Sequence, residues 1–227
     1  MKTYSKTIAA SILAVLALNA QAVTYNDATS DIAFGPATLD ITSVEVTHNA
    51  TDLFFTISVN AASITSPDWG KYTVGFDTAA GGDTSSPVGN PWGRNISMSS
   101  GMDYWVGSWV DGGGGRQLWS YTGSWNLLGA SSVGISGGSV NFSVPLAALG
   151  LSPGSTFNFD VYSTGGDGGN PAVDALGNPN QTVADWGGAY NSGANVLSYT
   201  IPAVPEPTAL ALLGIGASLI IGRIRRR

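Results

Sequence analysis

Seven tryptophans give this chain of 227 residues its most promising chemistry, because five of them fall within residues 92–125. Period-two alternation along extended segments places five side chains on one face of two successive strands: Trp105, Trp109, Gln117, Trp119 and Tyr121. The small Gly107 between the first two indoles would leave a shallow bay. Indole faces pack against apolar ring faces, so an exposed row of this kind predicts carbohydrate binding. A buried row would belong to a hydrophobic core, and both interpretations stay open.

Acidic side chains in glycine-containing loops are the second group with chemical potential. Residues 77–83 read Asp-Thr-Ala-Ala-Gly-Gly-Asp, and residues 167–174 form a second loop of this kind. Carboxylate oxygens on flexible loops suit Ca²⁺, which makes Asp77 and Asp83 candidate calcium ligands. Neither loop matches the EF-hand pattern, and ordinary turn formation also explains them. No other cofactor is expected.

Residues for catalysis are few. His48 is the only histidine and there is no cysteine, so triads of the Ser-His-Asp or Cys-His type lack convincing parts. The zinc-protease, nucleophile-elbow, P-loop and dinucleotide fingerprints do not occur. We therefore expect a protein that is not an enzyme. The alternative is a glycan-active hydrolase that uses two of the acidic residues, because glycoside hydrolysis needs a pair of carboxyl groups.

The first 22 residues have the pattern of a secretory signal peptide. Lys2 and Lys6 precede an apolar stretch over residues 8–18, and Ala20 and Ala22 form an A-x-A cleavage pattern. A basic start, a short apolar helix and small residues at the cut define such signals. We expect export, with Val23 as the first residue of the mature protein.

The last 23 residues contain three features in a fixed order. Pro205, Glu206 and Pro207 precede an apolar stretch over residues 208–222, which is followed by a basic end: Arg223, Arg225, Arg226 and Arg227. A helix of this length spans roughly 22 Å, less than the ~30 Å hydrocarbon core of a bilayer. Snorkelling arginines and local thinning make up such a deficit. The stretch therefore predicts a short transmembrane helix whose arginines stay in the cytoplasm.

This tail resembles the PEP-CTERM sorting signal of Gram-negative bacteria. The resemblance implies recognition by exosortase, a membrane protease, and cleavage near Pro205-Glu206-Pro207. It also implies an inner-membrane intermediate and transfer to the cell surface or to an extracellular exopolysaccharide matrix. The resemblance is confined to the tail and does not say what the preceding domain does.

The region between the two ends, residues 23–204, has the length of one domain and the pattern of an all-β protein. Short runs of alternating apolar residues recur between glycine- and proline-rich turns. The clearest runs lie at residues 41–48, 53–59, 71–77, 140–144, 157–161 and 197–201, and a single helical turn is expected at residues 145–151. Regularly spaced short strands predict an antiparallel β-sandwich, of the jelly-roll type or a related one.

Two features bear on what this domain binds. It contains three basic and fourteen acidic residues, which give a net charge of −11. Because phosphate backbones repel an acidic domain, nucleic acid is excluded as an expected partner. Residues 41–59 and 144–159 are similar to segments of sandwiches related to family 9 carbohydrate-binding modules and DOMON-like domains. That likeness implies a sugar-binding sandwich. We expect a surface protein that binds exopolysaccharide or is embedded in it, with a purely structural surface protein as a further alternative.

Overall fold

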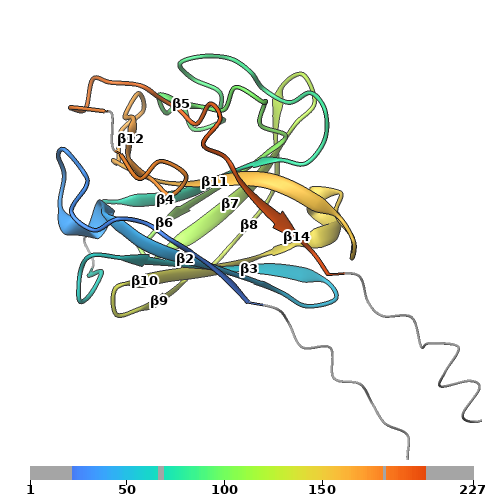
Figure 1. Cartoon of the computed structure of the whole chain (residues 1–227), viewed down its shortest axis with the longest axis horizontal. Coiled ribbons are helices and arrows are strands. Elements are labelled where there is room, and N and C mark those ends of the chain that lie inside the picture. The colour runs from blue at the N-terminus through green and yellow to red at the C-terminus, as the bar shows by residue number, and fades with distance from the viewer. Residues whose placement is uncertain (1–21, 66–68, 181–182, 203–227) are drawn as a thin grey trace, which may run out of the picture.

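The computed structural model describes residues 22–65, 69–180 and 183–202, and these fold into two antiparallel β-sheets packed face to face (Figure 1). The predicted all-β sandwich is therefore confirmed. None of the helices in the described parts of the chain is long and apolar enough to cross a membrane. The predicted signal helix and the predicted transmembrane segment at residues 208–222 lie outside those parts.

The first sheet has the strand order β1-β2-β3-β10-β9. Its strands are β1 (Val23–Asn26), β2 (Ile41–His48), β3 (Asp52–Val59), β10 (Ser139–Pro145) and β9 (Gly134–Ser136). The hairpin β2–β3 is the one predicted from alternation. Its turn is held by Asn49, whose Oδ1 accepts hydrogen bonds from the backbone N–H groups of Thr51 at 2.8 Å and Asp52 at 2.7 Å.

The second sheet has the order β12-β11-β4-β6-β7-β8, with β14 also paired to β11. Its strands are β12 (Ala172–Ala175), β11 (Thr156–Thr164), β4 (Lys71–Asp77), β6 (Tyr104–Trp109), β7 (Gly115–Tyr121), β8 (Trp125–Ser131) and β14 (Leu197–Thr200). A short parallel pair, β5 (Ile96–Ser97) and β13 (Tyr190–Asn191), lies apart from both sheets. Two 3-10 turns, η1 (Ala37–Leu39) and η2 (Leu146–Leu149), complete the fold. The turn η2 ends at Gly150 in the left-handed conformation (φ 66°), where glycine avoids Cβ strain.

The main hydrophobic core lies between the two sheets. The inward residues of β2, β3, β4, β10 and β11 alternate with outward ones, and every apolar residue predicted to face the core in these strands is buried there. Phe55 is at its centre, with ring centroids of Phe76, Phe142 and Phe159 at 5.7, 5.7 and 6.0 Å.

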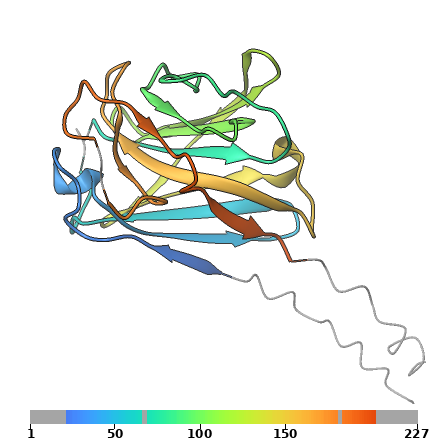
Figure 2. The ribbon, with the colours of Figure 1, turned by 45° about the horizontal axis from the view of Figure 1, so that its top comes forward.

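A second, smaller core covers the outer face of the second sheet. The loops that lie over this sheet (Figure 2) bring Met98, Met102 and Tyr190 onto Trp105 of β6 and Tyr162 of β11. Strand β6 is therefore buried on both faces, which a plain two-layer sandwich does not require.

The two ends of the sandwich carry different features. Strands β1 and β14, at the two ends of the described chain, lie together at one end (Figure 1), where the Tyr25 hydroxyl donates to the carbonyl of Ser198 at 2.7 Å. We call this the proximal end. At the opposite, distal end the registers bring Lys71, Trp109 and Thr164 side by side, together with the loop over residues 27–40.

Candidate functional site

The predicted aromatic face exists: Trp105 in it is buried, whereas Trp109, Gln117, Trp119 and Tyr121 are partly buried. Strands β6 and β7 pair with Trp105 opposite Trp119 and Gly107 opposite Gln117, so these side chains share one face of one sheet. Trp105, however, is fully buried in the second core and stacks on Tyr162 with a centroid distance of 6.1 Å. This burial favours the core interpretation of Trp105 over carbohydrate binding.

The bay predicted above Gly107 is filled by Trp92. A Cβ atom on Gly107 would lie only 2.3 Å from the Trp92 ring. The Oε1 atom of Gln117 accepts hydrogen bonds from Nε1 of Trp92 at 2.9 Å and of Trp119 at 3.2 Å. Gln117, which was predicted to contact a bound carbohydrate, therefore holds the indole rings of Trp92 and Trp119. Trp109 packs beside Trp92, with ring centroids 6.1 Å apart.

The calcium ligands predicted in the loop over residues 77–83 each accept hydrogen bonds from other residues. Asp83 is buried, and its two oxygens accept hydrogen bonds from the backbone N–H of Ser85 at 2.9 Å and from Nε1 of Trp125 at 2.8 Å. Asp77 accepts a long hydrogen bond of 3.4 Å from Asn158. The one group of three metal-ligating side chains among the described residues contains neither Asp77 nor Asp83, so calcium binding by these two residues stays a prediction.

Exposed tryptophans occur instead at the distal end. Trp69, just before β4, is 43% exposed, and Trp186, in the loop before β13, is 38% exposed. Their ring centroids are 5.5 Å apart at an interplanar angle of 66°. Phe34 packs edge-on against Trp186 at 4.7 Å and supports it from the loop over residues 27–40. We call Phe34, Trp69 and Trp186 the distal aromatic cluster.

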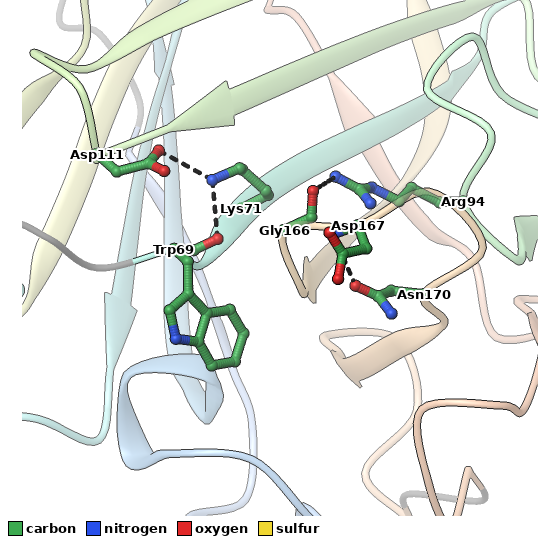
Figure 3. Close-up of polar contacts among 7 residues, drawn as sticks. All are labelled: Trp69, Lys71, Arg94, Asp111, Gly166, Asp167 and Asn170. Atoms are coloured by element: carbon green, nitrogen blue, oxygen red, sulfur yellow. Dashed lines mark hydrogen bonds and ion pairs between the residues drawn. The ribbon is translucent and has the colours of Figure 1, made fainter.

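Polar groups adjoin this cluster, as Figure 3 shows. The ammonium of Lys71 donates to the carbonyl of Trp69 at 2.8 Å and pairs with Asp111 at 2.9 Å. To the right of them in this view, the buried guanidinium of Arg94 donates to the carbonyl of Gly166 at 3.0 Å, and burial lowers the pKa of Arg94. The half-exposed Asp111 carboxylate and the indole N–H groups are the kind of acceptor and donors that sugar hydroxyls use.

Neither exposed tryptophan was predicted as a site residue. Each stands alone in the sequence, outside any alternating run, and the two are separated by more than a hundred residues. Only the fold brings them together. The one available signal was their place beside glycine- and aspartate-rich segments, which is a weak indication of a surface loop.

A group of acidic residues lies at the same end of the sandwich. Asp31, Asp40 and Asp174 each place a carboxylate oxygen within 4.8 Å of the others, and Asp27 adjoins them. We call these four residues the distal acidic cluster. Asp174 comes from the second of the two loops considered for calcium, whereas the other three come from the segment between β1 and β2.

Burial and mutual repulsion dominate the electrostatics of this cluster. Burial, together with the charge of Asp27, raises the pKa of Asp174 to about 8. Burial likewise raises the pKa of Asp27 to about 7 and that of Asp31 above its ordinary value. Asp160 in β11, whose charge acts on Asp27, is fully buried, and burial raises its pKa to about 7.

Comparison with known families adds one match. Residues 203–227 fit the PEP-CTERM protein-sorting motif. The chain carries a PEP-CTERM sorting signal. No curated protein matches the chain.

The PEP-CTERM signal establishes where this protein goes. It marks an exported protein that is sorted to the cell surface through its C-terminal signal and processed by exosortase, a membrane protein. Every residue predicted for the sorting signal, from Pro205 to Arg227, falls within the matched range. These residues and Ala20 lie outside the described parts of the chain. Ala22 is exposed and β1 begins at Val23, so cleavage after Ala22 would remove no residue of the first strand.

Proposed function

We propose that this cell-surface protein is retained in exopolysaccharide, and that the distal aromatic cluster makes the contact. The observation that carries the proposal is the pairing of two exposed indoles, Trp69 and Trp186, with ring centroids 5.5 Å apart. Exposed aromatic rings flanked by polar side chains are suited to the apolar faces and hydroxyl groups of sugars.

The position of the cluster supports this role. The sorting signal follows β14 directly, so it leaves the domain at the proximal end, whereas Trp69 and Trp186 lie at the distal end. A domain held at its C-terminal side therefore presents both indoles away from the point of attachment. The resemblance to family 9 carbohydrate-binding modules and DOMON-like domains, although it stays a prediction, points to the same class of ligand.

The net charge of the domain narrows the class of polysaccharide that it could bind. A net charge of −11 on residues 23–204 repels an anionic polysaccharide at low ionic strength. We therefore favour a neutral polysaccharide, whose binding depends on stacking and hydrogen bonds and is insensitive to salt.

The rival function, a glycan-active hydrolase, needs two carboxyl groups that a sugar can reach. Among the described residues, Asp31, Asp40 and Asp174 form the one group of three acids whose oxygens lie within 4.8 Å of one another, and the unpaired oxygens of Asp27, Asp31 and Asp40 are buried. A glycosidic bond has no access to those oxygens. We therefore favour a protein that is not an enzyme.

The test is a pair of variants, Trp69→Ala and Trp186→Ala, applied to a column or pellet of neutral polysaccharide. Each exposed ring contributes on the order of 1 kcal/mol by stacking, so each variant should bind about fivefold more weakly. Their melting temperatures should change little, because both rings are exposed. Phe54→Ala is the matched control, since Phe54 is exposed to a similar degree but lies on the outer face of the first sheet. Equal retention of all three variants and the unaltered protein would reject the proposal.

A further inference from the structure

Three carboxylates from separate elements converge at the distal end. Asp31 lies in the loop after β1, Asp40 immediately precedes β2, and Asp174 lies in β12 of the other sheet. Their oxygens lie within 4.8 Å of one another. Because Ca²⁺ binds oxygen at 2.3–2.6 Å, two ligands of one ion are separated by no more than roughly 5 Å. The spacing therefore fits a single shared calcium ion.

Several oxygens of this cluster are buried without a hydrogen-bond donor. The side chain of Asp40 is 2% exposed. Its Oδ2 atom accepts hydrogen bonds from the backbone N–H of Ser30 at 2.8 Å and from the side-chain amide of Asn60 at 2.9 Å. Its Oδ1 atom accepts no hydrogen bond from the described residues. The same is true of both side-chain oxygens of Asp31 and of Oδ2 of Asp27. Buried carboxylate oxygens are normally satisfied, and a bound cation would supply a partner of opposite charge.

The negative charge of the cluster is not offset by basic side chains. Within residues 22–65, 69–180 and 183–202 the basic residues are Lys71, Arg94 and Arg116. Lys71 pairs with Asp111 and Arg94 donates to Gly166, and the acid whose charge acts on Arg116 is Asp52. Close, buried like charges are unfavourable unless something of opposite charge pairs with them.

The buried carboxylate of Asp174 is also held in place. The two oxygens of Asp174 accept hydrogen bonds from the backbone N–H groups of Ile41 at 2.6 Å and Ala175 at 2.8 Å. Hydrogen bonds of this kind orient carboxylates that ligate metals. We propose that Asp31, Asp40 and Asp174 bind one calcium ion, with Asp27 as a fourth acid beside it. The ion would join the loop before β2 to the edge strand of the second sheet.

Calcium binding is measured on the full-length protein after treatment with EGTA, by calorimetric titration with CaCl₂ and with MgCl₂. We expect one calcium site per chain. Magnesium should bind at least tenfold more weakly, because Mg²⁺ requires a near-ideal octahedron at 2.0–2.1 Å that irregular loop ligands seldom provide. Calcium at about a hundredfold excess over its Kd should raise the melting temperature by roughly 5–10 °C.

Asp31→Asn is the decisive variant, because neither side-chain oxygen of Asp31 accepts a hydrogen bond from another of the described residues, and its replacement breaks no contact to a neighbour. It should weaken calcium binding at least about tenfold. Without calcium it should be as stable as the unaltered protein or more so, since it removes repulsion with Asp40. Asp77→Asn removes the same charge outside the cluster and should bind calcium normally.

Three results would overturn the proposal. The first is the absence of calcium binding to the unaltered protein, and the second is equal affinity for calcium and magnesium, which would indicate general attraction to an acidic surface. The third is unchanged calcium affinity of Asp31→Asn. None of these results depends on polysaccharide binding, so the calcium site and the proposed function can fail independently.

Discussion

Tryptophan side chains in this protein serve opposite purposes according to what covers them. The indole of Trp105 is enclosed by the second core, and its Nε1–H donates to none of the described residues. Trp92 and Trp119 share one acceptor on Gln117, whereas Trp69 and Trp186 meet solvent. An unsatisfied buried N–H is costly, so the Trp105 ring must contribute through packing.

Trp105→Ala should lower the free energy of unfolding by about 3–5 kcal/mol, because a large buried ring is replaced by a cavity. Trp105→Phe should cost much less, since it keeps most of the ring and removes the unpaired N–H group. Denaturation in urea measures both changes. An alanine variant as stable as the unaltered protein would contradict the burial of Trp105.

The only histidine offers a clean pH measurement. Nδ1 of His48 lies 2.8 Å from the hydroxyl of Tyr199, and burial lowers the pKa of His48. Burial raises the pKa of Tyr199 to about 12, so this hydroxyl stays protonated and can donate to the neutral ring. The unfolded chain, with an ordinary histidine pKa near 6.5, therefore takes up a proton first as the pH falls.

Stability due to His48 is thus fully present above about pH 6.5 and is lost as the pH falls below it. Nuclear magnetic resonance can follow the single imidazole without interference from other histidines. Its titration midpoint should lie below 6.5, and Tyr199→Phe should move it upward by removing the donor to Nδ1. A midpoint at or above 6.5 in the unaltered protein would contradict this account.

Strand β6 is the element on which both cores depend. Val106 belongs to the main core, whereas Trp105 belongs to the second. Gly107 between Trp105 and Trp109 leaves the space that the Trp92 ring occupies. A small residue at this point in the strand is therefore a packing requirement rather than a source of flexibility.

Gly107→Ala should destabilise the protein by about 1–3 kcal/mol, because the new methyl group would lie 2.3 Å from the Trp92 ring and must displace it. Gly129→Ala in β8 is the matched control, since a Cβ atom there meets no atom within 4 Å of the described structure, and its effect should be neutral or slightly stabilising. Thermal or chemical denaturation compares the two variants. Equal stability would show that Trp92 does not rest on Gly107.

Alternation was sufficient to predict the strands that build the main core, because one polar and one apolar face identify β2, β3, β4 and β10 directly. It also placed Trp105 and Trp119 on one face. It could not say what covers that face, since the covering residues Trp92, Met98 and Met102 come from irregular segments. The distal clusters were beyond prediction for a related reason. Asp40 and Asp174 meet only because two sheets pack together.

At the scale of the whole molecule, the two ends of the sandwich carry different features. The proximal end holds the strands that lead to the sorting signal and to the predicted signal peptide, and the distal end holds the aromatic and acidic clusters. This arrangement separates sorting from the proposed binding surface. Processing of the tail need not disturb the distal loops.

The sorting signal predicts a dependence on exosortase. In a host that lacks this protease, the protein should accumulate in unprocessed form, because the segment over residues 203–227 is not removed. Immunoblotting of membrane and surface fractions detects the difference in mass and location. The same release from hosts with and without exosortase would show that the tail acts only as an anchor.

The last prediction links the two distal clusters and depends on both proposals. Asp31 and Phe34 belong to one loop, and Phe34 packs on Trp186 at 4.7 Å. A calcium ion that fixes this loop should also fix the Trp186 ring, and a ring that is already ordered loses less entropy on binding. Chelation of calcium should therefore weaken retention on neutral polysaccharide several-fold.

The variant Asp31→Asn separates this effect from other actions of the chelator. Its retention should be low in the presence of calcium and nearly unchanged by EGTA, whereas Asp77→Asn should lose retention on chelation as the unaltered protein does. Phe34→Ala should bind calcium normally but respond weakly to chelation, because it removes the contact between the loop and Trp186. If calcium binds and yet retention of the unaltered protein is the same with and without EGTA, the two clusters act independently and the ion serves stability alone.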